Sequence, residues 1–259
     1  MMTKDKQNTA PRTAALQKIL IIGYGKMGHV LEDAIADTPD TTVAAIVGKT
    51  PDADVYAELS AIDTPFDCLV DFSHHSNINK VLRYAQEKNK PLVMAVTGFN
   101  ETQRQQIADA ATCIPIVFAQ NMSAGVNILK GVIAHLSRAL GDGFDIELIE
   151  KHHNQKEDSP SGTAKMLLAA IHQIEDKTLV YGREGYKKRA KNEIGVHSVR
   201  GGTIAGEHTI LFAGHDEIIE IKHTALSKRI FADGAIRAAR FAVTHGAGLY
   251  GMDDILKTK

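Results

Sequence analysis

The sequence predicts an α/β fold in which a Rossmann-type, doubly wound parallel sheet is joined to a second α+β domain with a mixed or antiparallel sheet. In the first half, short apolar runs alternate with segments whose apolar residues recur every three or four positions. This is the pattern of buried parallel strands with covering helices. After about Gly141, apolar runs follow one another with one clear helix between them, which is typical of a separate α+β domain.

The first half contains five predicted strands, at residues 18–22, 43–47, 68–72, 91–96 and 115–119. The first strand stops at Gly23, and Met27, Val30, Leu31 and Ala34 then recur at helical spacing. Further helices are expected from Ile78 onward and over residues 101–112. Strands that alternate with helices in this way form parallel sheets with helices on both faces.

The second half begins with a long helix predicted over residues 123–140. Strands are expected at residues 145–150, 195–200, 207–212 and 217–223, and helices at 163–174 and 229–243. We expect the last helix to return to the first domain, which gives a flexible tail at 1–17, a first domain at 18–121 with 229–259, and a second at 122–228. In the strand at 217–223, Ile219 and Ile221 share one face, and Ile218 lies on the other with Glu220 and Lys222. That second face is a candidate surface for a partner subunit.

Composition and charge exclude several classes of protein. The 259 residues carry 30 basic and 31 acidic side chains, a net charge of −1, so nothing favours a nucleic-acid or membrane partner. The apolar runs are too short to span a bilayer. The two cysteines exclude a disulfide framework and lack metal-site spacing. The polar N-terminus lacks the apolar core of a secretory signal, so we expect a cytoplasmic protein.

A glycine-rich segment, Gly23-Tyr24-Gly25-Lys26-Met27-Gly28, fits the pattern G-x-G-x-x-G between a predicted strand and a predicted helix. Glycines allow a tight turn there and a close approach of the backbone, so that free N–H groups at the helix start face a pyrophosphate. The alternative is a purely structural turn. The context favours a dinucleotide site.

The acidic residue that usually binds the ribose hydroxyls is missing after the second strand, where the chain continues with Gly48-Lys49-Thr50. Lys49 and Thr50 are candidates to bind a 2′-phosphate, by charge and by hydrogen bond. This favours NADPH slightly and leaves NADH possible. Asp52 and Asp54 lie nearby in the sequence, and their negative charge would disfavour binding of a phosphate. The alternative interpretation of Lys49 is a solvated surface lysine.

A second cluster, residues 150–156, contains His152, His153 and Lys156 at the end of a predicted strand. Histidine exchanges protons near neutral pH, and lysine donates a proton or holds a carboxylate. Neighbouring residues of a strand point to opposite faces, so the two histidines are expected to differ in role unless the strand has already ended before them. A solvated basic turn is one alternative. A metal site is disfavoured because no cysteine or spaced carboxylate set accompanies the pair.

A third cluster, Ser159-Pro160-Ser161-Gly162-Thr163, precedes the helix predicted from residue 163. Small and hydroxyl residues at a helix start leave backbone donors free, which suits a carboxylate. The alternative is simple N-capping by Ser161 or Thr163. Together with the preceding cluster, this segment points to an anionic substrate beside a nicotinamide.

At this point the chain resembles a known family. Residues 150–164 closely match the signature E-x-H-H-x-x-K-x-D-x-P-S-G-T-A of the 4-hydroxy-tetrahydrodipicolinate (dihydrodipicolinate) reductases. Other matching segments are 70–73, 97–99, 119–127, 206–209 and 231–235, so the resemblance spans about residues 18–256. It implies an NAD(P)H-dependent oxidoreductase of the diaminopimelate route to lysine, with a dinucleotide-binding domain, a substrate-binding and oligomerisation domain, and a homotetrameric assembly.

The resemblance also implies roles for residues. His152 would donate or accept a proton, and Lys156 would be the proton donor. The dicarboxylate substrate would be held by His153, Ser161, Gly162 and Thr163, with Thr97 at the seam with the nicotinamide. The implied cofactor-binding residues are Gly23, Tyr24, Gly25, Lys26, Met27, Gly28, Lys49, Phe72, Ser73, Ala95, Val96, Thr97, Ala119, Gln120, Asn121 and Met122.

Three places in the chain, two short segments and one single residue, depart from the family pattern. Ala95-Val96-Thr97 stands where many members have Gly-Thr-Thr, Gly48-Lys49 replaces an acidic residue followed by arginine, and Lys26 replaces a frequent arginine. The second change opens the choice between NADH and NADPH. Two other functions remain as alternatives: a dehydrogenase for a different imino or amino acid, and a catalytically silent dinucleotide sensor.

Overall fold

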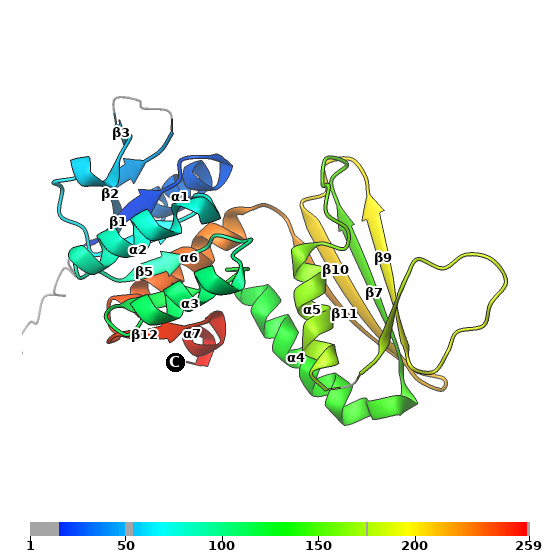
Figure 1. Ribbon diagram of the computed structural model, residues 1–259. Helices are drawn as coiled ribbons and strands as arrows, with labels where there is room; N and C mark the ends of the chain where they lie inside the picture. The colour runs from blue at the N-terminus through cyan, green and yellow to red at the C-terminus, as the bar shows by residue number, and fades with distance from the viewer. Residues whose placement is uncertain (1–15, 50–53, 175, 258–259) are drawn as a thin grey trace, which may run out of the picture.

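The computed structural model describes residues 16–49, 54–174 and 176–257, which form two sheets with their helices (Figure 1). Most of the predicted tail lies outside the described residues, as do Thr50 and Asp52. Gln17, placed in the tail by the sequence analysis, is already the first residue of a strand.

The first sheet has seven strands in the order β12-β6-β5-β4-β1-β2-β3, and every pairing in it is parallel. This confirms the Rossmann-type sheet predicted from the alternating pattern. The strands are β1 (Gln17–Ile22), β2 (Thr41–Val47), β3 (Val55–Tyr56), β4 (Cys68–Asp71), β5 (Leu92–Met94), β6 (Pro115–Phe118) and β12 (Gly248–Tyr250).

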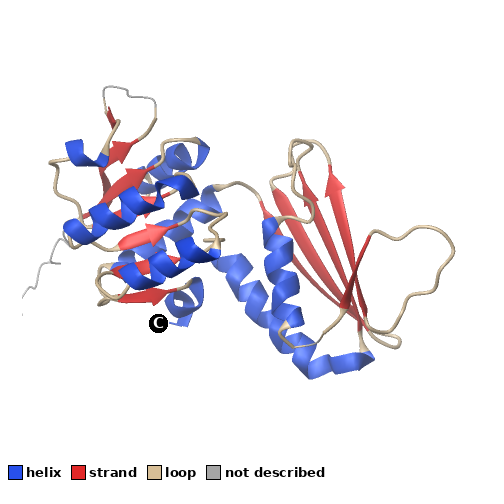
Figure 2. Cartoon of the chain, viewed as in Figure 1, coloured by secondary structure: helices blue, strands red, loops and turns tan. Residues whose placement is uncertain are grey.

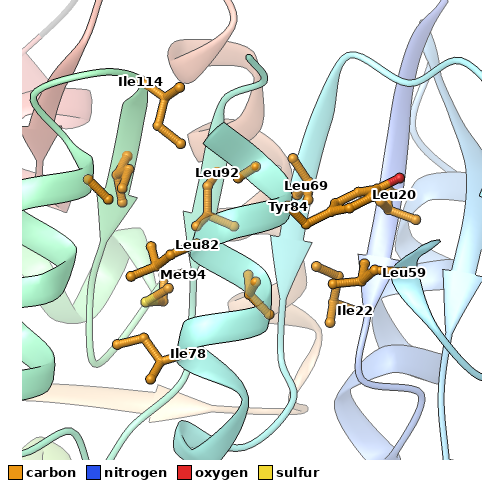
Figure 3. Close-up of a cluster of buried hydrophobic side chains, with 14 of the residues drawn as sticks. Leu20, Ile22, Leu59, Leu69, Ile78, Leu82, Tyr84, Leu92, Met94 and Ile114 are labelled. Carbon is orange, nitrogen blue, oxygen red and sulfur yellow. The ribbon is translucent and has the colours of Figure 1, made fainter. Parts of the chain in front are cut away.

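Helices cover both faces of this sheet, as Figure 2 shows. One face carries α2 (Ile78–Glu87) and α3 (Glu101–Ala110), and the other carries α1 (Lys26–Ala36), α6 (Arg229–Ala242) and α7 (Met252–Lys257). Residues 19–22 of β1 are continuously apolar because both of their faces are buried: Leu20 and Ile22 belong to the first layer, drawn in Figure 3, and Ile19 and Ile21 to the second. A strand buried on both faces has no position for a polar side chain.

The second sheet has the strand order β11-β10-β7-β9-β8 and is mixed. Strand β10 pairs antiparallel with β7 and β11, whereas β9 pairs parallel with β7 and β8. This confirms the predicted second sheet. Its strands are β7 (Asp145–His152), β8 (Thr178–Tyr181), β9 (Glu193–Arg200), β10 (Gly206–Ala213) and β11 (Ile218–Ala225).

Two helices, α4 (Ala124–Leu140) and α5 (Gly162–His172), pack on one face of the second sheet (Figure 1). Their side chains form a third apolar core with alternate residues of the strands, such as Leu148 and Phe212. On β11, Ile219 and Ile221 pack against this core and Ile218 on the opposite face is 68% exposed. The helix-free face of the sheet is called the open face below.

The sequence analysis missed three short strands, β3, β8 and β12, and one short helix, α7. Strands β3, β8 and β12 have two to four residues, too few for a periodic pattern, and Leu249 in β12 is 48% exposed. Short 3₁₀ turns occur at Leu59–Ala61, His75–Asn77 and Gly141–Gly143. No helix among the described residues has the length and apolar character that crossing a membrane requires.

Candidate active site

The glycine-rich turn connects β1 to α1, and its three glycines differ in their steric surroundings. A Cβ on Gly28 would lie 2.3 Å from the carbonyl oxygen of Gly23, and one on Gly23 would lie 2.6 Å from the backbone of Ser73. A Cβ on Gly25 would meet nothing within 4 Å. Gly23 and Gly28 therefore allow backbone to pack on backbone, whereas Gly25 leaves open space at the first turn of α1.

This open space belongs to a cavity of about 470 Å³ at the carboxyl ends of β1, β2 and β4. Six predicted cofactor residues line it: Gly23, Tyr24, Gly25, Lys49, Phe72 and Ser73. Gly25 caps α1 without a side-chain hydrogen bond, so the helix start presents backbone donors toward the cavity. Glycine backbone, the donors of a helix start and the exposed Lys49 are groups that suit a dinucleotide phosphate chain.

Two further side chains of the cavity, His74 and Lys80, were missed by the sequence analysis. His74 directly follows the predicted pair Phe72-Ser73, so extending that segment by one residue would have found it. Lys80 lies on α2 and forms an ion pair of 3.3 Å with Glu58. Neither side chain has a motif of its own that marks it.

The other predicted cofactor segments lie elsewhere on the same sheet edge. Residues 95–97 follow β5 and residues 119–122 connect β6 to α4, and the lining of the cavity includes neither segment. Met122 is buried in the core, and Lys26 is an exposed residue in the first turn of α1. Asn121 donates a hydrogen bond of 2.9 Å from Nδ2 to Oγ1 of Thr163 on α5. It therefore links the first sheet to the predicted carboxylate-binding turn.

The centre of the second cluster is Glu150, whose side chain is completely buried on β7. Its Oε2 accepts a hydrogen bond from Nδ1 of His152 at 2.5 Å, and Arg200 donates to both carboxylate oxygens, at 2.7 and 2.9 Å. Burial raises the pKa of Glu150, but the hydrogen bonds from Arg200, Ser198 and His152 outweigh it and lower the pKa to about 2. Glu150 is therefore a carboxylate at every physiological pH.

His152 is the last residue of β7 and is buried beside His208 of β10, with 5.1 Å between their ring centroids. Burial lowers the pKa of His152, and the charges of Lys156 and Arg200 lower it further, against the opposing effect of Glu150. Burial and the neighbouring His152 lower the pKa of His208 to about 4. Both imidazoles are consequently neutral at neutral pH.

The two adjacent histidines differ in their surroundings, and because β7 ends at His152 the alternation of strand side chains does not extend to His153. His153 follows the end of β7 and is half-buried. Lys156 lies in the next turn, where its Nζ is 2.6 Å from Oδ1 of Asp158. Burial raises the pKa of Asp158, but the hydrogen bond and charge of Lys156 lower it overall.

Helix α5 begins at Gly162, one residue before the predicted start, and Ser161 is its N-cap. The Oγ of Ser161 accepts a hydrogen bond of 3.1 Å from the N–H of Ala164 and lies 2.9 Å from Nε2 of His208. The N-capping alternative is therefore realised for Ser161. Gly162 is exposed and Thr163 half-buried at the same helix start. The structure thus places Ser161 next to the histidine cluster of β7 and β10.

Comparisons with known proteins match the two halves of the chain separately. The family "Dihydrodipicolinate reductase, N-terminus" matches residues 17–122, and "Dihydrodipicolinate reductase, C-terminus" matches residues 125–256. The chain belongs to the dihydrodipicolinate reductase family. The resemblance inferred from the signature at 150–164 is therefore confirmed, and with it the class of enzyme, an NAD(P)H-dependent oxidoreductase.

Individual relatives of the family support the assignment over nearly the whole chain. The 4-hydroxy-tetrahydrodipicolinate reductase of Exiguobacterium sibiricum is 47% identical, covering 92% of this chain and 96% of the relative. That of Clostridium novyi is 39% identical, covering 94% and 100%. A dipicolinate-bound dihydrodipicolinate reductase structure from Paenisporosarcina sp. TG-14 shares the fold, with a TM-score of 0.78, 21% identity, and coverage of 93% of this chain and 99% of that one.

Proposed function

We propose that this chain reduces 4-hydroxy-tetrahydrodipicolinate to tetrahydrodipicolinate, with NAD(P)H as the hydride donor and loss of water, in the diaminopimelate route to lysine. The relatives that carry this name cover almost the whole chain. The observation that carries the proposal is the buried pair of Glu150 and His152 beside Lys156 and the start of α5. Proton-transfer groups and a carboxylate-binding helix start occur together there.

We infer that the cavity at the glycine-rich turn holds the dinucleotide. Gly25 and the start of α1 would bind the pyrophosphate through backbone N–H groups. Lys49, exposed at the end of β2, would bind a 2′-phosphate, and this favours NADPH over NADH. When bound, the reduced nicotinamide supplies a hydride. Residues 95–97 and 119–122, at the carboxyl ends of β5 and β6, would orient the nicotinamide end.

The protein's own part in the chemistry is to hold the dicarboxylate and to supply a proton. The N–H groups of Gly162 and Thr163, with His153, would bind the carboxylates, since a helix start favours anions. Lys156 would donate the proton that the developing negative charge on the ring nitrogen requires, with His152 assisting. For this step the Lys156 ammonium must leave Asp158, to which it is bound at 2.6 Å.

We propose further that the chain forms a homotetramer in which open faces of the second sheet meet. On that face Ile218 is 68% exposed, and Glu207 pairs with Lys222 and Lys151 at 2.7 and 3.4 Å. Light scattering should give four times the chain mass, and Ile218→Asp should lower it, because a charge would then be buried in the interface. A monomeric wild type contradicts the proposal. The cytoplasmic location stays a prediction.

The test is a coupled assay in which the preceding synthase makes the substrate from pyruvate and aspartate semialdehyde. Oxidation of NADPH or NADH is followed by absorbance in parallel reactions, and we expect rapid oxidation only when all components are present. A folded protein that binds cofactor but oxidises neither would overturn the proposal. It would favour a dehydrogenase for another imino or amino acid, or a dinucleotide sensor.

A further inference from the structure

One buried carboxylate connects the groups that the proposed reaction needs. Besides His152 and Arg200, Glu150 accepts a hydrogen bond of 3.2 Å at Oε1 from the backbone N–H of Ser161, the N-cap of α5. Arg200 in turn donates from Nη2 to the carbonyl oxygen of Asp158 at 2.7 Å. A single side chain therefore contacts the proton-transfer histidine and the carboxylate-binding helix, and its arginine partner reaches the turn that carries Lys156.

The hydrogen bonds of Glu150 decide which nitrogen of His152 carries a proton. An ionised carboxylate only accepts hydrogen bonds, so Nδ1 of His152 must be the donor in their contact. In the neutral ring Nε2 is then unprotonated. Glycine at position 206 avoids a close contact with this nitrogen, because a Cβ there would lie 3.1 Å from Nε2. Nε2 is therefore the ring nitrogen able to accept a proton.

We propose that Glu150, clamped by Arg200, is the positioning residue of the reaction: it holds His152 in the Nδ1–H tautomer and fixes the start of α5 against it. The proposal rests on the proposed function, because it assumes that His152 takes part in proton transfer. Glu150 itself touches neither cofactor nor substrate in this assignment. It acts through His152 and Ser161.

The charged and titratable groups around His152 set the expected pH effect. Glu150 faces His152 from β7, and Arg200 faces it from β9. Lys156 lies in the turn after β7, and His208 lies on β10. His223 of β11 lowers the pKa of His208. Glu150 is the one group in this set that raises the pKa of His152. Without its charge, His152 would face two cations, and its pKa would fall further.

The decisive variant is Glu150→Gln, and the same strand provides a matched control. Glu147 also pairs with an arginine and a histidine, at 3.2 Å to Arg189 and 3.0 Å to His197, but on the open face. Both variants are first checked for folding and for assembly mass. We expect Glu150→Gln to lower kcat about 100-fold, with cofactor Kd unchanged, and to shift the His152-dependent limb of the pH profile to lower pH. Glu147→Gln should leave kcat and the profile unchanged.

Equal losses in both variants, or an unchanged pH profile in Glu150→Gln, overturn the proposal, because the carboxylate would then only stabilise the sheet. A second measurement needs no variant of Glu150. In wild-type protein labelled with nitrogen-15 histidine, the ring shifts of His152, assigned by the missing signal in His152→Gln, should show the Nδ1–H tautomer. An Nε2–H tautomer overturns the proposal. This readout also separates it from the proposed function, since the tautomer is measured whether or not the wild type reduces the substrate.

Discussion

Nδ2 of Asn121 lies 2.9 Å from Oγ1 of Thr163, and this hydrogen bond joins a predicted cofactor residue to a predicted substrate residue. Oδ1 of Asn121 accepts a hydrogen bond from the N–H of Ser123, and its carbonyl oxygen accepts one from Nδ2 of Asn127. The end of β6, the start of α4 and the start of α5 are therefore held together. The two halves of the proposed active site meet at this residue.

His152→Gln and Lys156→Ala should both reduce turnover while leaving the cofactor Kd unchanged, since neither side chain lines the glycine-loop cavity. A lost proton-transfer group typically costs about 10²- to 10⁴-fold in rate, and we expect the larger loss for Lys156→Ala. The measurements are steady-state kinetics and cofactor titration by fluorescence. If both variants unfold and bind NADPH poorly, the turn after β7 is structural rather than catalytic.

Lys49→Ala should weaken NADPH binding about tenfold, the effect of one lost charge-assisted contact, and should change NADH binding little. The reason is that Lys49, exposed at the end of β2, would contact only the 2′-phosphate in the proposed site, and NADH lacks this group. Kd values for both cofactors give the answer. Lys80→Ala removes a second lysine of the same cavity and is the control for a general loss of positive charge there. Equal weakening of NADPH and NADH by Lys49→Ala removes Lys49 from the phosphate site.

Alanine at Gly25 and at Gly28 should separate cofactor binding from stability. Gly25→Ala places a methyl group in open space, so the free energy of unfolding should change by less than about 0.5 kcal/mol, while the cofactor Kd rises because the pyrophosphate approaches there. Gly28→Ala forces a Cβ to 2.3 Å from the carbonyl oxygen of Gly23 and should cost about 1–3 kcal/mol. Urea unfolding and cofactor titration of each variant test this. Normal cofactor binding by Gly25→Ala would contradict the assigned phosphate site.

Asp71 makes folding stability depend on pH. Burial raises its pKa to about 6, although hydrogen bonds from Ser73 oppose the shift. Because the folded state binds the proton more tightly than the unfolded state, stability falls as pH rises from about 4 to about 6 and stays reduced above that. Two pKa units correspond to about 3 kcal/mol, an upper bound.

Asp71→Asn should therefore increase the free energy of unfolding at about pH 7.5 and leave it nearly unchanged at about pH 4. The amide oxygen still accepts the hydrogen bond that the N–H of Ser73 donates at 2.8 Å. Urea unfolding at both pH values measures the difference from wild type, and Asp63→Asn, at an exposed carboxylate, is the control. A difference from wild type that is the same at both pH values would show that Asp71 is ionised without penalty.

The sequence by itself determined the elements whose signal is local. Residues 19–22 of β1 are apolar without interruption because both of their faces are buried, and α1 follows from the spacing of its apolar residues. The glycine-rich turn and the segment at 150–164 are each continuous in the sequence, so their residue types predicted a cofactor site and identified the family. Short elements such as the edge strand β12 gave no pattern, because three residues are too few to show a hydrophobic period.

The tertiary structure alone decided the contacts between distant residues. Arg200 lies 50 positions after Glu150 and His208 lies 47 after Ser161, and nothing in the local sequence of either marks its partner. The pairing of β7 with β9 and β10 brings them together. A buried carboxylate needs such donors, because its charge is stable away from water only when it is hydrogen-bonded. The sequence thus indicated the groups proposed to react, and the sheet register decided which side chains lie beside them.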